Sequence, residues 1–338
     1  MSVIYLYGFA FIAALVLTGL LRRYALAKSI IDVPNARSSH TVPTPRGGGI
    51  AIVISFIIGL LWLLVEGNAA WQAAVAVGGA GVLIAIVGFM DDHGHIAARW
   101  RLLGHFFGAI WVLVWLGGFP PLEVFGLRLE AAAILGIFAT LYLVWLLNLY
   151  NFMDGIDGLA SVQAITALFG MALIYWLMNF DHLMVLPLML GFAVAGFLYW
   201  NYPPAKIFMG DGASGFLGIT LGALSIQGAW AAPAFCWSWV ILLGVFIVDA
   251  TYTLVRRLAR GDKVYEAHRS HAYQYASRFY GRHLPVTLGV LAINGLWLLP
   301  IAVAVAMDWL SGMIGVMIAY LPLIGLAIKY HAGELERP

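Results

Sequence analysis

The stretch WQAAVAVGGAGVLIAIVGFMDD, residues 71–92, decides the class of fold for this chain. It runs from Trp71 to Met90 without a charged residue and then ends on two adjacent aspartates. A helix needs roughly 20 apolar residues to cross the hydrocarbon core of a bilayer. We therefore predict a membrane-spanning helix that carries a pair of carboxylates at one end.

Apolar runs of this kind recur along the whole chain. Of its 338 residues, 63% are hydrophobic and 10% are charged, whereas a soluble domain carries about 25% charged residues. The pattern predicts an all-α, polytopic membrane protein of ten or eleven spans that forms a single domain over residues 1–338. The expected spans lie near 3–21, 47–65, 71–90, 102–118, 131–150, 162–178, 184–201, 215–232, 234–254, 285–306 and 312–330. Ala232-Pro233 separates the eighth and ninth spans, with one long kinked helix as the alternative.

Basic residues gather on one side of these expected spans. With the N-terminus outside, 17 of the 18 Lys and Arg residues fall in cytoplasmic segments, and Arg128 is the exception. This asymmetry predicts a cytoplasmic C-terminus. The expected cytoplasmic segments lie near 22–46, 91–101, 151–161, 202–214 and 255–284. Short basic loops differ from the broad basic surface that nucleic-acid binding requires, so we expect no nucleic-acid partner.

The first apolar run and the single cysteine exclude two other features. The first run lacks a positively charged segment before it, so we expect a retained span rather than a cleaved signal. Cys236 lies in an apolar segment and is the only cysteine. An intramolecular disulfide and a thiolate metal cluster are therefore excluded, and a packing role is expected.

The inner end of the third expected span carries DDHGHIAARWRLLGH, residues 91–105. Adjacent carboxylates repel each other, so Asp91 and Asp92 favour a nearby cation or a raised pKa. A magnesium ion would satisfy the pair, and a carboxylate with a raised pKa would serve as a general base. A solvated pair at a helix end is the alternative. Arg99 and Arg101 are candidate phosphate ligands, although the positive-inside rule also explains them.

NLYNFMDGIDGLA, residues 148–160, places amides and carboxylates where the fifth expected span meets the cytoplasm. Asn148 and Asn151 are three residues apart, as are Asp154 and Asp157, so a continuing helix would stack each pair on one face. The two glycines of the stretch would instead permit close approach of the backbone to a ligand. A polar turn between spans is the alternative.

KIFMGDGASGFLG, residues 206–218, leads into the eighth expected span. Its glycines flank Asp211, so backbone amides and a helix N-terminus would receive phosphate oxygens while the carboxylate holds a metal ion. Phe208 is a candidate for stacking on a base, with simple packing as the alternative. The stretch therefore indicates a site for a phosphate and a cation.

Two longer inner loops add cationic candidates for binding phosphate. They are Arg37, His40 and Arg46 in residues 32–49, and His268, Arg269 and His271 in residues 256–278. Attachment of the second loop to anionic lipid is the alternative. Carboxylate, amide and phosphate oxygens suit Mg²⁺ or Mn²⁺, whereas zinc would need more His or Cys ligands than these loops offer.

Taken together, these segments resemble the polyprenyl-phosphate N-acetylhexosamine-1-phosphate transferases of glycosyltransferase family 4, over about residues 30–275. DDHGHIAARWRLLG looks like the aspartate-pair motif of the family, NFMDGIDGLA is close to its most specific signature, and FMGDGASGFLG matches its magnesium-aspartate motif. EAHRSHAYQ is more similar to the O-antigen-initiating members than to the muramyl-pentapeptide translocases, which carry three successive histidines there.

The resemblance implies a role for most of the candidate residues. The implied roles are Mg²⁺ binding by Asn151 and Asp211, catalysis by Asp91 and Asp92, and nucleotide-sugar binding by Asp154, Asp157, Phe208, His268, Arg269 and His271. The candidates for binding phosphate, including the lipid phosphate, stay Arg37, His40, Arg46, Arg99 and Arg101. Within the nucleotide site, Phe208 would stack on uracil and Asp157 would contact the edge of the base.

The resemblance also implies a reaction. N-acetylhexosamine 1-phosphate would pass from a UDP-sugar to undecaprenyl phosphate at the cytoplasmic face of a bacterial inner membrane, with release of UMP. The partners would be UDP-N-acetylhexosamine, undecaprenyl phosphate and the bilayer, with a homodimer left open, and the product would start O-antigen, lipopolysaccharide or related polysaccharide synthesis. Because two phosphates repel each other, a divalent ion and fixed cations are the main requirement.

Alternatives remain at two levels. Direct attack and a covalent aspartyl intermediate are both compatible with the spacing of the aspartates. A secondary transporter of a polar or phosphorylated solute is the rival class, although transporters place their sites near the bilayer midplane rather than in inner loops. A non-catalytic lipid scaffold is the second rival, and it would tolerate loss of Asp211.

Overall fold

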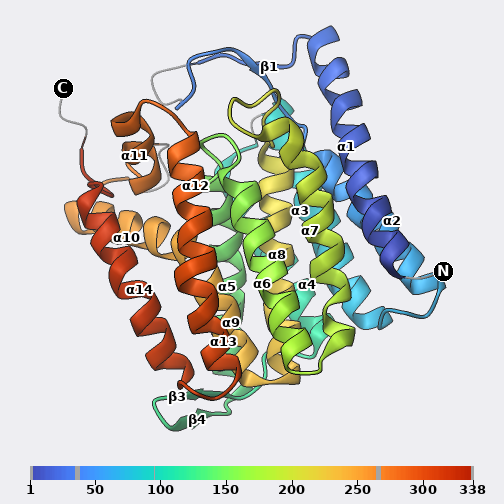
Figure 1. The fold of residues 1–338 in the computed structure, drawn as a ribbon, viewed down its shortest axis with the longest axis vertical. Helices are drawn as coiled ribbons and strands as arrows, with labels where there is room; N and C mark the ends of the chain where they lie inside the picture. The colour runs from blue at the N-terminus through green and yellow to red at the C-terminus, as the bar shows by residue number, and fades with distance from the viewer. Residues whose placement is uncertain (1–2, 35–38, 95, 264–267, 336–338) are drawn as a thin grey trace.

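The computed structural model describes residues 3–34, 39–94, 96–263 and 268–335. Within these residues the molecule consists of long helices, most of which run side by side (Figure 1). The strands of this described part form two short antiparallel pairs. The predicted all-α, multi-pass fold is therefore confirmed.

The helices and strands have the following bounds. They are α1 Val3–Ala27, β1 Ile31–Asp32, β2 Thr44–Pro45, α2 Ile50–Val65, α3 Trp71–Gly94, α4 Ala98–Leu116, β3 Leu122–Val124, β4 Leu127–Leu129, α5 Ala132–Phe152, α6 Leu159–Leu177, η1 Asp181–Leu183, α7 Val185–Asn201, α8 Asp211–Ala231, α9 Pro233–Leu242, α10 Gly244–Arg260, α11 Ala272–Tyr280, α12 Leu284–Ile293, the π-helical η2 Asn294–Leu298, α13 Leu299–Ala306 and α14 Gly312–Lys329.

Each of the eleven predicted spans overlaps a helix or a run of two or three consecutive helical segments. By length and apolar character, seven helical segments of the described chain can cross a membrane, or eight if the bent pair α9 and α10 counts as one span. The apolar helix α2 has 16 residues and is shorter than a full span. Seven or eight of the ten or eleven predicted spans are therefore supported by the length and apolar character of the helices, and the full count stays a prediction.

The ninth predicted span, 234–254, is sharply bent in the structure. It is divided into α9 and α10, which meet at Leu243 with a bend of 70°. At this break the carbonyl of Leu242 accepts a hydrogen bond of 2.8 Å from the Gln163 side chain. A side chain from α6 therefore satisfies a backbone group that would otherwise be unpaired inside the membrane domain. The predicted division at Ala232 is confirmed, because Ala232 is extended between α8 and α9.

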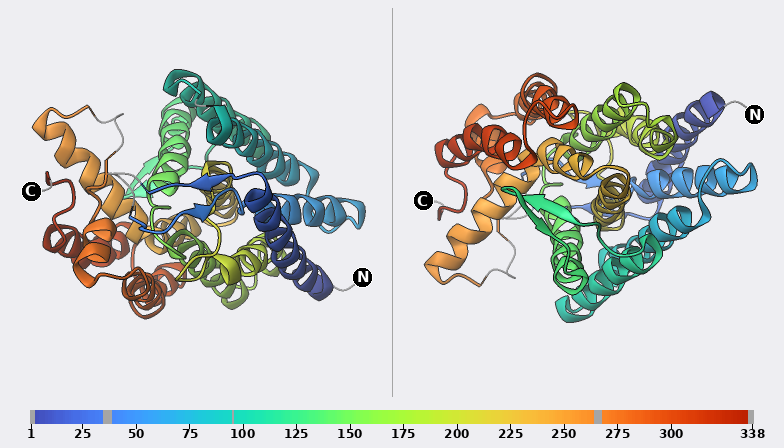
Figure 2. Two further views of the ribbon diagram at one scale, coloured as in Figure 1. Left: turned by 90° about the horizontal axis from the view of Figure 1, so that it is seen from above. Right: turned by 90° about the horizontal axis from the view of Figure 1, so that it is seen from below.

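Helix α8 forms the centre of the bundle (yellow in Figure 2). Its residues from Gly212 to Ile226 are all buried. An added Cβ at Gly218 would lie 2.6 Å from Leu147 Cα of α5, and one at Gly88 of α3 would lie 2.6 Å from the Asp211 carbonyl. Small residues thus let three helices approach closely, which is the usual way of packing helices within membranes.

The two strand pairs mark opposite ends of the bundle (Figure 1). The β3–β4 hairpin lies at one end, while β1 and α11 lie at the other. The second end also receives the start of α8, which carries Asp211. The predicted motifs are therefore brought to the end of the bundle opposite the hairpin.

Candidate active site

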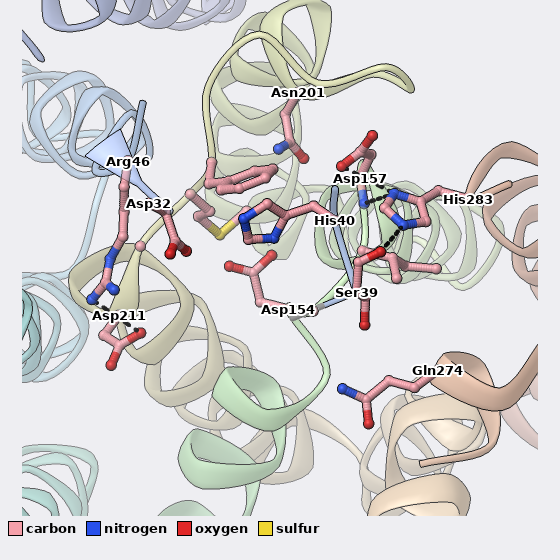
Figure 3. A pocket seen from close by; sticks show the side chains of 15 residues that line it. Asp32, Ser39, His40, Arg46, Asp154, Asp157, Asn201, Asp211, Gln274 and His283 are labelled. Atoms are coloured by element: carbon pink, nitrogen blue, oxygen red, sulfur yellow. Dashed lines mark hydrogen bonds and ion pairs between the residues drawn. The ribbon is translucent and has the colours of Figure 1, made fainter. Parts of the chain in front are cut away.

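A cavity of about 180 Å³ lies at this end of the bundle (Figure 3). Six of the predicted site residues line it, namely His40, Arg46, Asp154, Asp157, Phe208 and Asp211. They come from the loop before α2, the loop between α5 and α6, the loop between α7 and α8, and the start of α8. Segments that are far apart in the sequence thus form one polar site, as the motifs predicted.

Backbone pairing joins two of these segments. The Phe208 N–H donates to the Pro45 carbonyl at 2.8 Å, and the Gly48 and Gly49 N–H groups donate to the carbonyls of Phe208 and Met209, each at 3.0 Å. An added Cβ at Gly49 would lie 2.4 Å from Ala213 Cβ. The glycine run at 47–49 is therefore needed for the close approach that places Arg46 beside the start of α8.

A compact group of charges surrounds the first turn of α8. The Asp92 carboxylate accepts a hydrogen bond of 3.0 Å from the Asp211 N–H and forms an ion pair with Arg46. The same guanidinium lies 4.0 Å from Asp211 Oδ1. Arg46 is thus the fixed cation shared by two carboxylates, next to the positive end of a helix dipole.

The Asp154 side chain faces this group, and its carboxylate forms no ion pair or hydrogen bond with any described residue. Burial raises its pKa well above the usual value, and the negative charges of Asp211 and Asp157 raise it further, whereas Arg46 lowers it. A carboxylate in this position is stabilised in its charged form by an added cation. The electrostatics therefore favour cation binding between Asp154 and Asp211.

Asp211 also lines a second, much smaller cavity of about 20 Å³, together with Arg101 and Asn151. The Asn151 amide nitrogen donates to Ser214 Oγ at 3.0 Å, so its carbonyl oxygen remains for another ligand. Asp91 forms an ion pair with Arg101 and accepts a hydrogen bond of 2.9 Å from the Ile96 N–H. The two aspartates of the predicted pair thus face different partners.

The donor set fits a hard divalent ion. Asp211 lines both cavities, Asp154 lines the larger one and Asn151 the smaller one. Their carboxylate and amide oxygens are the ligands that Mg²⁺ prefers. Among the described residues, no group of three or more His, Cys, Asp or Glu side chains would hold a metal ion by itself. Water and substrate phosphates would have to complete the coordination of a bound ion, as is usual for Mg²⁺.

His268 and His271 form a separate cluster outside the lining of both cavities. Their ring centroids lie 4.9 Å apart, and His271 Nδ1 lies 3.2 Å from Asp249 Oδ1. The Asp249 carboxylate also accepts hydrogen bonds of 3.0 Å from the backbone N–H groups of Ala272 and Tyr273. A buried carboxylate on α10 therefore fixes the start of α11 and the orientation of His271.

Three arginines complete the predicted set, and two of them lie in the described residues. Arg99 is exposed, with its guanidinium 5.6 Å from the centroid of the Trp100 ring, and it lines neither cavity. Arg269 is partly buried, and its carbonyl accepts a hydrogen bond from Arg278. The predicted residue Arg37 lies outside the described residues.

Several lining residues of the main cavity were not predicted as site residues. They are Asp32, Ser39, Asn201, Gln274 and His283. Asn201 offered a signal, because it is a polar residue at the inner end of an apolar run just before two prolines. His283 stands outside every recognised motif, so its place could be found only from the fold.

The chain is similar to known proteins over most of its length. A sequence model described as glycosyl transferase family 4 matches residues 73–229. A "Probable undecaprenyl-phosphate N-acetylglucosaminyl 1-phosphate transferase" of Bacillus subtilis (strain 168) is 28% identical over 321 residues, 93% of this chain and 88% of that protein. A "Phospho-N-acetylmuramoyl-pentapeptide-transferase" of Streptococcus pneumoniae (strain Taiwan19F-14) is 30% identical over 244 residues, 66% of this chain and 71% of that protein.

A third relative agrees with these two. It is an "Undecaprenyl-phosphate alpha-N-acetylglucosaminyl 1-phosphate transferase" of Thermotoga maritima. It is 26% identical over 268 residues, which are 79% of each chain.

Proposed function

This chain belongs to the polyprenyl-phosphate N-acetylhexosamine-1-phosphate transferases of glycosyltransferase family 4, and from this premise we propose the reaction that it catalyses. N-acetylhexosamine 1-phosphate passes from a UDP-sugar to undecaprenyl phosphate, and UMP is released. The observation that carries the proposal is the single cavity that brings Asp154, Phe208 and Asp211 together. A carboxylate cluster with an adjacent aromatic ring suits a nucleotide diphosphate bound with a cation.

Asp211, Asn151 and Asp154 are the residues that would hold Mg²⁺ or Mn²⁺ at the junction of the two cavities. When bound, the ion supplies positive charge against the repulsion between donor and acceptor phosphates. Phe208 offers its ring to the base, and Arg46 offers a fixed cation beside the carboxylates. The chain's own groups therefore mainly orient the two anions.

The two aspartates of the third span are assigned different tasks. The Asp92 carboxylate accepts a hydrogen bond from the Asp211 N–H, so Asp92 lies beside the proposed ion site. We assign Asp92 the contact with the acceptor phosphate and any transfer of its proton. Asp91 pairs with Arg101, which lines the smaller cavity. We assign Asp91 the task of holding the Arg101 guanidinium there, in position to bind a substrate phosphate.

Apolar grooves on the outside of the bundle support a lipid acceptor. One groove lies between α2 and α3 and is lined by Ile50 and Phe89, among others. It lies close to Asp211, because a Cβ added to the next residue, Gly212, would be 3.2 Å from atoms of both Ile50 and Phe89. A second lies between α4 and α5 and includes Phe106, next to the smaller cavity's His105. A prenyl chain in the bilayer would thus reach the site along an apolar surface.

The proposal includes a place and a pathway. The site end of the bundle faces the cytoplasm of a bacterial inner membrane, in agreement with the basic residues of the inner loops. The product is the first lipid-linked intermediate of O-antigen or a related envelope polysaccharide. UDP-GlcNAc is the first donor to test, because two of the relatives carry N-acetylglucosaminyl in their names.

The test is release of UMP by the purified protein with undecaprenyl phosphate, Mg²⁺ and a panel of UDP-N-acetylhexosamines. We expect Asp211→Ala to abolish both UMP release and exchange of labelled UMP into UDP-sugar. Asp181→Ala, at the opposite end of the bundle, is the matched control and should keep both activities. Solute flux in liposomes without UMP release would support a transporter instead, and exchange that survives Asp211→Ala would contradict the proposal.

A further inference from the structure

His283 stands immediately before α12 and joins two loops across the main cavity (Figure 3). Its Nδ1 lies 3.1 Å from Asp157 Oδ1, and its Nε2 lies 3.0 Å from the Ser39 carbonyl oxygen. The three residues are separated by more than a hundred positions in the chain, yet all of them line the same cavity. One imidazole ring therefore sets the spacing between two walls of the site.

The Asp157 side of this bridge is otherwise held by backbone and neutral groups. Its second carboxylate oxygen accepts a hydrogen bond of 3.0 Å from the Ala205 N–H. Its carbonyl accepts a hydrogen bond of 2.9 Å from the Thr287 hydroxyl of α12. Among the described residues, His283 is thus the side chain that can offer a positive charge to the buried Asp157 carboxylate.

The Ser39 side of the bridge carries unsatisfied polar groups. Ser39 Oγ and His40 Nε2 are buried and find no hydrogen-bond partner within the described part of the chain. The His40 ring also meets the Phe208 ring edge to face, with centroids 4.8 Å apart. Buried groups of this kind normally have partners, so a fixed Ser39 carbonyl keeps two groups placed for a ligand beside Phe208.

The ring joins the two loops in either protonation state. The Nε2–H donates to the Ser39 carbonyl in both, and a second proton, with its positive charge, would direct an Nδ1–H toward the Asp157 carboxylate. Burial opposes that charge, but the hydrogen bond and the charge of Asp157 outweigh it, so the pKa of His283 is raised. The Asp157 N–H also lies 3.3 Å from Nδ1, which would suit a neutral ring. In both protonation states the ring holds the Asp157 loop and the Ser39 loop together.

We propose that His283 is a positioning residue for the nucleotide, which holds Asp157 and the Ser39–His40 segment at a fixed distance on either side of the base-binding end of the cavity. This inference rests on the proposed function, because it takes the uridine nucleotide as the ligand of that cavity. His283 acts through the two loops and does not take part in the transfer. Its loss should therefore weaken nucleotide binding while the acceptor side is little affected.

The experiment compares His283→Ala, His283→Gln and the exposed neighbour control Arg282→Ala. Binding of UMP is measured by calorimetry on the purified protein, and KM is measured separately for UDP-sugar and undecaprenyl phosphate. Loss of hydrogen bonds to a charged group should raise the Kd for UMP and the KM for UDP-sugar by about tenfold in His283→Ala. The KM for undecaprenyl phosphate should stay within about twofold of the wild-type value.

The glutamine variant provides the readout that separates positioning from simple folding. Its amide can still donate to one of the two acceptors, so it should recover part of the lost UMP affinity. If His283→Ala folds poorly, the comparison of His283→Gln with Arg282→Ala carries the test. Unchanged UMP binding in both His283 variants, or an equal rise in KM for both substrates, would overturn the inference.

The proposed reaction and this inference fail in different ways. UMP binding that depends on His283, in a protein that releases no UMP from UDP-sugar, would contradict the reaction and leave the positioning role standing. UMP release by the wild type with full activity in His283→Ala would contradict the positioning role alone. A wild-type protein that does not bind UMP would overturn both.

Discussion

Substitution of Gly88 by alanine should damage the site without touching any ionisable group. Gly88 lies on α3, one turn before Asp92, where α3 crosses the start of α8. An added Cβ would lie 2.6 Å from the carbonyl carbon and oxygen of Asp211 and 2.6 Å from Gly212 Cα. All three atoms belong to the backbone, so no side chain can rotate away to make room.

The size of the effect follows from this contact. Ordinary van der Waals contact begins at 3.4 Å, so the two backbones must separate by about 0.8 Å, the difference between 3.4 Å and 2.6 Å. Overpacking of this kind costs about 1–3 kcal/mol of stability. A displacement of about 1 Å in a catalytic group costs on the order of 10²-fold in rate. We therefore expect kcat for UMP release to fall on the order of 10²-fold.

The assay measures kcat together with thermal unfolding in detergent, so that lost activity is distinguished from lost protein. Gly289→Ala on α12 is the matched control, because an added Cβ there meets nothing within 4 Å. It should keep its activity and become slightly more stable, since alanine favours a helix over glycine. A Gly88→Ala enzyme with wild-type kcat and wild-type unfolding temperature would refute the reasoning.

Three other perturbations have expected outcomes. Asp249→Asn would turn an amide N–H₂ toward groups that donate hydrogen bonds to the Asp249 carboxylate. This substitution should cost about 1–3 kcal/mol of stability, and it should lower UMP release because His271 is misplaced. Thermal unfolding and UMP release are measured on the same preparation. Burial, followed by the charges of His271 and Arg257, lowers the pKa of His268 from 6.5 to about 3. The unfolded chain then takes up this proton at higher pH than the folded chain, so the stability of the fold decreases as the pH drops below 6.5. His268→Gln removes this proton uptake, so its unfolding temperature should decrease less than that of the wild type between about pH 7 and about pH 5. Chelation of divalent ions should abolish UMP release, and added Mg²⁺ or Mn²⁺ should restore it, because the available donors are oxygens; activity that is unchanged by chelation would contradict the proposed metal site.

The fold was largely predictable because its physical cause is local. Each long apolar run must satisfy its backbone hydrogen bonds internally in a membrane, and a helix does this within one segment. The break between α9 and α10 was missed because its cause is not local. The apolar sequence continues through Leu243, while the carbonyl at the break is satisfied by Gln163 from another helix.

The sequence motifs predicted which polar side chains would lie together better than they predicted their partners. The motifs identified Asp154, Phe208 and Asp211, which share one cavity. Asp91 and Asp92 were expected to act as a pair, but successive residues of a helix point about 100° apart. One side chain therefore meets Arg101 and the other meets Arg46. Contacts of this kind depend on how the helices pack against each other, and the spacing of motifs along the sequence gives no information about that packing.

The β3–β4 hairpin offers a practical handle on the molecule. Its register pairs Val124 with Leu127, so the turn consists of Phe125 and Gly126, both with positive φ and both outside the bundle core. An epitope inserted at this tip would sit at the end of the molecule farthest from the carboxylates. Accessibility of such a tag to antibody in intact cells would report which face of the membrane the hairpin occupies, in an enzyme that still works.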